Sequence, residues 1–243
     1  MANAVVDDDK AADASSPEPA GTKLTALPLR FEAGSYLAPT SDVVAHLVLA
    51  HQTQMHNLIT LTNYKTRLAL YAHTAEAKGE DASADASLPE SVRQRFEGPS
   101  EQLLRYLLFA NETPLSAADG QRIIGSSAFA RAFQSRGLRD SKGRSLRDFD
   151  LGTRIFRYPC SYLIYSDAFD RLPGPAKDYV YHRLLAILSG QDQSPDFARL
   201  SAQDRRAILE ILLATKTGLP GEWKEYAKSA HIQVAAAPAV HGS

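Results

Sequence analysis

Residues 41–77 contain neither Gly nor Pro, and this uninterrupted stretch is the feature that most constrains the fold. Such a run favours one long helix, because Gly and Pro are the residues that destabilise a helix interior most. Ser41 is a suitable N-cap, Asp42 complements the positive end of the helix dipole, and Gly79 suits the far end. We therefore expect an all-α protein, an irregular multi-helix bundle built around one long helix at about 41–77.

The composition of the 243 residues, 44% hydrophobic and 23% charged, is typical of a globular protein. The formal net charge of −1 creates no overall field that would attract nucleic acid or an anionic membrane, so neither is expected as a partner. The longest apolar run, Val43 to Ala50, is interrupted by His46 and is far shorter than a transmembrane helix. The N-terminus lacks the basic region and apolar stretch of a signal peptide, which by itself predicts a cytoplasmic protein.

Composition divides the chain into three parts. Residues 1–22 are rich in Ala, Asp, Ser and Pro and are expected to be disordered, and the Ala-rich tail at 229–243 is expected to be frayed. The sequence between them, 23–228, predicts a single helical domain. Its first residues, 24–38, are expected to form an extended lead-in that packs against the long helix.

Periodic apolar residues and capping signals predict further helices in this domain. They are expected at about 89–96, 100–112, 126–137, 175–190 and 201–218, the last beginning with a capping box of Ser201 and Asp204. Residues 160–172 are interpreted as helical, with a buried strand at 160–165 as the alternative. Residues 137–158 mix Arg with Asp and predict a long irregular loop with short extended pieces.

The long helix carries a compact group of potential metal or haem ligands, His51, Met55 and His56. His46, His51 and His56 are five residues apart, which rotates neighbours by about 140° around a helix, so no two of them chelate a metal alone. His51 shares its face with apolar residues and is either a core histidine bonded to a carbonyl or hydroxyl, or a ligand completed from another helix. Met55 suits a gap-filler, and His56 is expected on a polar surface. No cofactor is predicted outright, and haem or a transition metal is the alternative.

The irregular loop offers a candidate site for an anion or a protein partner, made of four arginines: Arg144, Arg147, Arg154 and Arg157. Asp residues between them favour the other interpretation, a solvated loop held by Arg–Asp pairs, since phosphate-binding strips usually lack acidic residues. We expect Asp148 and Asp150 to form such pairs. No nucleotide-binding loop or RNA-binding signature is present.

Cys160 is the single cysteine, so the chain has neither a disulfide framework nor a cysteine metal knuckle. A reactive thiol needs a base and a lowered pKa, and His182 is the candidate base. The neighbouring Tyr158, Tyr162 and Leu163 favour burial, and a buried cysteine is usually an inert apolar residue.

Three stretches of the sequence, 41–70, 143–173 and 200–223, resemble an uncharacterised bacterial family over roughly Phe31 to Trp223. In that family the corresponding block resembles the C-terminal part of a longer, exported protein. The resemblance implies a periplasmic setting, in contrast to the cytoplasmic one that the missing signal peptide predicts. It implies no activity and no catalytic residue.

Three functional hypotheses follow. The leading one is a non-enzymatic helical module that binds a protein partner or forms part of an envelope-associated assembly, because no catalytic motif is present and the irregular loop has mixed charge. The alternative is a haem- or metal-binding, redox-associated protein that uses His51. An enzyme that uses Cys160 or the Arg/Asp loop is the third.

Overall fold

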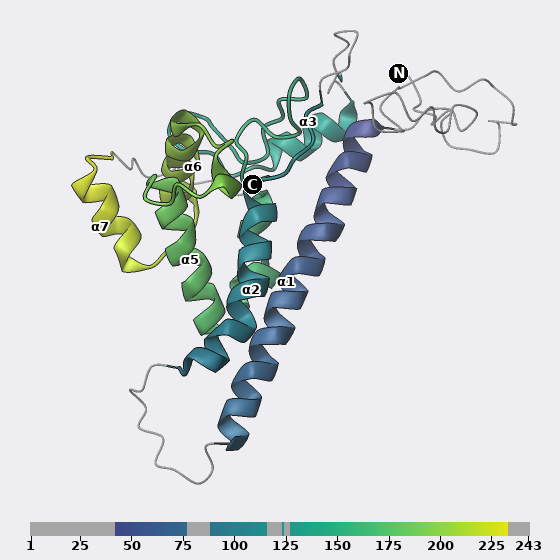
Figure 1. Ribbon diagram of the computed structural model, residues 1–243. Helices are drawn as coiled ribbons and strands as arrows, with labels where there is room; N and C mark the ends of the chain where they lie inside the picture. Colours follow the sequence, from purple (N-terminus) through teal and green to yellow (C-terminus); the bar gives the residue numbers. More distant parts are fainter. Residues whose placement is uncertain (1–41, 77–87, 116–122, 124–126, 233–243) are drawn as a thin grey trace, which may run out of the picture.

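The computed structural model describes residues 42–76, 88–115, 123 and 127–232, and the predicted all-α class is confirmed (Figure 1). Within these ranges the chain forms seven α-helices and two short 3-10 helices, with one isolated β-bridge between Phe149 and Phe156. The predictions for residues 1–22 and for the lead-in at 24–38 lie outside the described residues, as does the predicted frayed tail at 229–243 beyond residue 232. None of the described helices combines the length and the apolar character needed to cross a lipid bilayer.

The predicted long helix is α1, Val43–Glu76, which runs along one edge of the described structure (Figure 1). Asp42 caps it, since its Oδ1 accepts hydrogen bonds from the N–H groups of Val44 at 3.0 Å and Ala45 at 3.2 Å. The buried side chains recur every three or four residues and therefore occupy one face of the helix. They are Val44, Val48, His51, Met55, Ile59, Thr62, Thr66 and Ala69.

Helix α2, Glu90–Leu107, packs along α1. The sequence predicted two helices here, separated near Pro99, and this was wrong because α2 continues through Pro99. Gly98 lacks the Cβ that would clash with the proline ring in a helical conformation, so the helix continues through this point. The hydroxyl of Thr62 on α1 donates to the carbonyl of Pro99 at 3.3 Å and ties the two helices together.

Three more helices follow in chain order: α5 (Gly174–Leu188), α6 (Ala202–Thr215) and α7 (Gly221–Ser229). Helix α5 packs on α2, α6 packs on α5, and α7 packs on α6 (Figure 1). The predicted cap of α6 is confirmed, since the Ser201 hydroxyl accepts the N–H of Asp204 at 3.0 Å. A buried guanidinium, that of Arg205, fixes the connection from α5 to α6, which includes the 3-10 helix η5 (Pro195–Phe197). It donates to the backbone carbonyls of Ile187, Asp192, Phe197 and Leu200.

The segment at 160–172 is helical, as predicted, and the strand alternative is wrong. It consists of a 3-10 helix, η4 (Tyr162–Tyr165), and one α-helical turn, α4 (Asp167–Asp170). Each begins with a serine cap: Ser161 accepts the N–H of Leu163 at 3.3 Å, and Ser166 accepts that of Phe169 at 3.2 Å. These local bonds compete with strand pairing and favour short helical turns.

Helix α3, Ala128–Ser135, has Ser127 as its N-cap and leads into the irregular segment, residues 137–158. Backbone hydrogen bonds connect 148–151 with 154–157, which gives the short extended pieces that were predicted. Asp148 pairs with Arg139 at 2.9 Å, as expected. Asp150 does not form an ion pair in the described structure; its carboxylate accepts hydrogen bonds from Gly152 and Thr153 and closes the turn between the two pieces.

Candidate functional site

His51 lies inside the bundle, with 3% of its surface exposed, and the predicted burial is confirmed. Its Nε2 is 2.7 Å from the Oγ of Ser161, so the expected partner is a hydroxyl from another segment. Ser161 is itself fully buried and also caps η4. This hydrogen bond therefore joins the middle of α1 to the start of η4.

Aromatic rings surround the His51 imidazole. Those of Tyr106 and Phe109 stack on it with centroid distances of 5.3 and 4.8 Å, and those of Phe156 and Tyr162 lie at 5.7 and 6.1 Å. Burial lowers the pKa of His51 to about 4, because the charged imidazolium is disfavoured away from water. The side chain is therefore neutral at neutral pH and acts as a polar member of an aromatic core.

Met55 and His56, the other two candidate ligands, lie in different surroundings. Met55 is fully buried in the core, while His56 is exposed on the surface of α1. Among the residues that the structure describes, no three His, Cys, Asp or Glu side chains gather in a way that would hold a metal ion. A metal or haem site at His51 stays a prediction.

Cys160 is fully buried, and burial raises the pKa of its thiol well above the usual range. Its proposed base, His182, is exposed and contacts Glu222 on α7 at 3.1 Å. The thiol is thus protonated at neutral pH and shielded from solvent, which matches the apolar reading of this residue better than the reactive one.

The four candidate arginines contact different groups. Arg144 binds Asp140 at 2.6 Å and Glu210 on α6 at 2.7 Å. The guanidinium of Arg147 lies 4.9 Å from the ring centroids of both Phe133 and Tyr162. Arg154 is 3.4 Å from Asp204, and Arg157 lies 5.8 Å from the Tyr158 ring. In the described structure no single partner is shared by the four arginines. Arg144 and Arg154 hold the loop in place through their ion pairs with Glu210 and Asp204 on α6.

A half-open pocket of about 280 Å³ lies where the end of α2 meets the irregular segment and the residues around η5. Phe109 lines it and reaches the aromatic core behind, because the same ring stacks on His51; its φ of 53° is unusual for an aromatic residue. Glu112 and Arg154 also line the pocket. Burial raises the pKa of Glu112, although the N–H of Ile155 and the charge of Arg154 oppose this.

Among the described residues, most of the exposed large apolar side chains lie on α1, on the side away from the core. These side chains are Leu49, Tyr64, Leu68 and Tyr71, with 60%, 58%, 45% and 76% of their surfaces exposed. Tyr64, Leu68 and Tyr71 are spaced by four and three residues and so form one continuous stripe, which we call the exposed stripe. The sequence interpretation missed it because it assigned the apolar residues of this helix to a single buried face.

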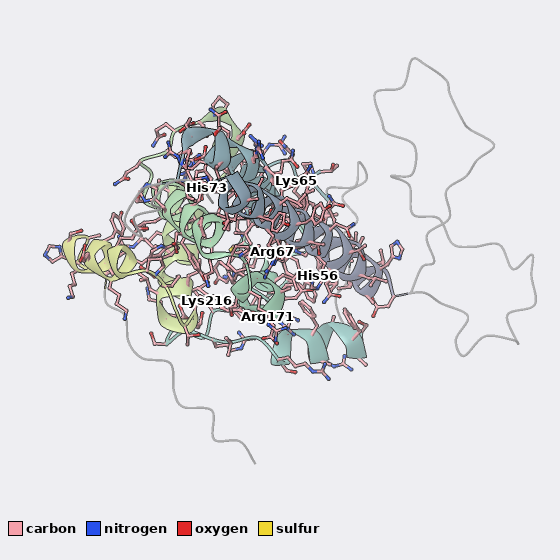
Figure 2. The ribbon with its side chains drawn as sticks, turned by 90° about the horizontal axis from the view of Figure 1, so that it is seen from below. His56, Lys65, Arg67, His73, Arg171 and Lys216 are labelled. Carbon is pink, nitrogen blue, oxygen red and sulfur yellow. The ribbon has the colours of Figure 1, made fainter. Side chains whose placement is uncertain are left out.

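Two basic side chains of α1, Lys65 and Arg67, are exposed close in sequence to the exposed stripe, and Figure 2 labels both. Between Val43 and Ala75 the sequence of α1 contains no Asp or Glu. Lys216 is buried and paired with Asp170 at 2.5 Å, so it does not contribute to this surface. Arg67 bonds to a neutral amide, the Oδ1 of Asn63, at 2.7 Å. This side of the molecule therefore presents apolar side chains next to positive charge.

Comparisons of the chain with family models, with curated proteins and with solved structures give no match. The resemblance to a bacterial family, and the periplasmic setting that it implies, stay predictions.

Proposed function

We propose that this protein is a helical module that binds another protein through the exposed stripe of α1. The observation that carries the proposal is the exposure of Tyr64, Leu68 and Tyr71 on one side of a helix whose opposite side is buried in the core. Isolated apolar residues are common on protein surfaces, but a contiguous group on one helix face is typical of an interaction site.

The chemistry of the exposed stripe suits a protein interface. Tyrosine is enriched among the residues that dominate binding energy, because it buries a large area and loses few rotamers. Tyr64 and Tyr71 lie about 10 Å apart along the helix at a rise of 1.5 Å per residue, a spacing that one partner helix spans in two turns. The stripe lies on a helix held to the rest of the domain by a fully packed face, so binding would cost little ordering of the backbone.

A photo-crosslinking residue in place of Tyr71 tests this proposal in the cells that produce the protein. We expect the crosslink to join the chain to one other protein and to disappear when Tyr64→Gln and Leu68→Gln are added, since these changes remove the rest of the stripe. The matched control carries the same crosslinker in place of Leu138, which is 46% exposed but belongs to the irregular segment.

Three outcomes would contradict the proposal. One is the absence of any specific crosslink at position 71, and another is the same product from position 138. The third is a crosslink to residues 1–41 of the same chain, or to a second copy, because the stripe would then serve the protein's own assembly.

A further inference from the structure

The spacing of apolar residues on the solvent side of α1 extends beyond the exposed stripe. Leu61 and Ala75 continue it, so the side chains Leu61, Tyr64, Leu68, Tyr71 and Ala75 alternate in steps of three and four. This alternation is the a/d pattern of a coiled coil, in which two helices pack along a narrow apolar seam. Leu61 is half-buried and Ala75 exposed, and we call these five positions the α1 seam.

The buried side of the same helix does not use this seam. Thr62, Thr66 and Ala69 face the interior and are 0%, 0% and 1% exposed. Along this stretch α1 therefore has two opposite packing surfaces, one occupied by its own domain and one directed to solvent. A helix that lies on the α1 seam would not disturb the contacts between α1 and α2.

Charged residues flank the α1 seam in the positions that coiled coils use to select partners. With Leu61 and Leu68 at a and Tyr64 and Tyr71 at d, Lys65 is at e and Arg67 at g. At 100° per residue, Lys65 lies about 100° to one side of Tyr64 and Arg67 about 60° to the other. Both are exposed, and neither belongs to any ion pair within the described residues (Figure 2).

We propose that the α1 seam pairs with an acidic amphipathic helix of a different protein, as a short heterotypic coiled coil. This inference rests on the proposed function and names the class of partner. Glu or Asp at the partner's e and g positions would meet Lys65 and Arg67, with no acidic group on α1 to repel them. A second copy of this chain is disfavoured, because its α1 contains no Asp or Glu between Val43 and Ala75 and would leave Lys65 and Arg67 without an acidic partner.

Two synthetic helical peptides of about three heptads provide the test; they share Leu and Ile at a and d, and carry Glu or Lys at e and g. We expect the full-length protein to bind the acidic peptide at least about tenfold more tightly than the basic one, measured by fluorescence anisotropy. The preference should shrink when the salt concentration rises from about 0.05 to about 0.5 M.

Charge reversal with Lys65→Glu and Arg67→Glu should invert the preference. The matched control is Lys224→Glu with Lys228→Glu on α7, which changes the net charge equally at exposed positions and should leave the preference unchanged. Circular dichroism should show the same helix content in both variants, because all four side chains are exposed.

The remaining outcomes separate this inference from the proposed function. If position 71 crosslinks another protein while charge reversal leaves the peptide preference unchanged, the acidic-helix inference is wrong and partner binding by α1 stands. If neither peptide binds, but the protein dimerises in sedimentation or binds anionic phospholipid vesicles through Leu68, the inference is wrong. If the acidic peptide binds only after residues 1–41 are removed, those residues are the occupant and both proposals fail.

Discussion

The buried face of α1 and the irregular segment at 137–158 both hold polar groups away from water, but they do so by different chemistry. On α1 the group is a neutral imidazole, that of His51, bonded to one hydroxyl and enclosed by aromatic rings. In the irregular segment the group is a carboxylate, that of Asp140, which is 5% exposed and accepts from Arg144 and two backbone N–H groups. The first region is stabilised by packing and the second by charge.

The difference shows which interactions determine each conformation. The α1 backbone satisfies its own hydrogen bonds, and its side chains only choose which face is buried. The irregular segment has few backbone bonds of its own and depends on distant groups, since Arg144 also binds Glu210 on α6 and Ile155 donates to Glu112 beyond α2. The segment is therefore expected to be more sensitive to single changes of charge than α1.

The largest effect is expected from Asp140→Asn. The amide accepts hydrogen bonds more weakly than the carboxylate and leaves Arg144 with a single acidic partner. Breaking one partner of a buried ion pair costs about 3–5 kcal/mol in free energy of unfolding, measurable by urea denaturation. The control is Asp167→Asn, whose carboxylate is 89% exposed and 3.8 Å from Arg171, and which should cost under about 0.5 kcal/mol. Equal losses in the two variants would contradict the importance of charge in the segment.

A steric change in the same segment should cost about 1–3 kcal/mol. In Gly137→Ala the new Cβ would overlap the Oγ of Ser145, so the segment must move to relieve the overlap. Gly221→Ala, at the start of α7, places a Cβ with no neighbour within 4 Å and should change the free energy of unfolding by less than about 0.5 kcal/mol. If both alanine variants were as stable as the parent, the close approach of residues 137 and 145 would not constrain the segment.

The same contrast explains how much of the fold the sequence predicted. The course of α1 and the burial of His51 followed from the helical period, because neighbours on one helix face share one environment. Burial implied a hydrogen-bond partner for His51, but the sequence did not select the hydroxyl among the alternatives. The break predicted at Pro99 was wrong, because Gly98 lacks the Cβ whose clash with the proline ring usually ends a helix at that point. The partners of Asp150 and of the four arginines could not be predicted, since they depend on which distant segments the fold brings together.

The exposed stripe was not predicted from the sequence. The spacing within 61–75 was present in the sequence, but the same helix offers Val44, Val48, Met55 and Leu58 as an apolar face, and only the packed structure shows which face is left outside. A role for Lys65 and Arg67 in binding can be inferred only once the exposed side of α1 is known. Periodicity therefore indicated how α1 folds, and packing decided which side of α1 is free to bind.

Acid should destabilise the two regions in different pH ranges. Protonation linked to His51 should lower the free energy of unfolding by about 2 kcal/mol. The pKa of this residue is about 4 in the folded protein and 6.5 in the unfolded chain, so the unfolded chain binds more protons between these values. The stability that the neutral imidazole provides is complete above about pH 6.5 and decreases as the pH falls toward 4, by about 2 kcal/mol between pH 7.5 and pH 5. Urea denaturation of the parent and of His51→Gln at these two pH values should show that only the parent loses this amount.

The irregular segment should respond at lower pH. Burial alone would raise the pKa of Glu210, but hydrogen bonds from Lys142, Arg144 and Arg206 lower it to about 2 from the ordinary 4.5. Its contribution is present above about pH 4.5 and is lost as the pH falls through 2. If His51→Gln retained the loss of stability between pH 7.5 and pH 5, that loss would come from other groups and the assignment to His51 would be wrong.

The smallest effect on stability is expected on the other side of α1. Replacing Tyr64, Leu68 and Tyr71 together by Gln should change the free energy of unfolding by less than about 1 kcal/mol, because exposed positions contribute little and Gln is a good helix former. On the buried side, Met55→Ala should cost about 2–5 kcal/mol by leaving a cavity. The triple variant should nevertheless lose the binding of the acidic peptide. A triple variant as unstable as Met55→Ala would show that the exposed stripe packs against another part of the chain, and α1 would then have no face free for a partner.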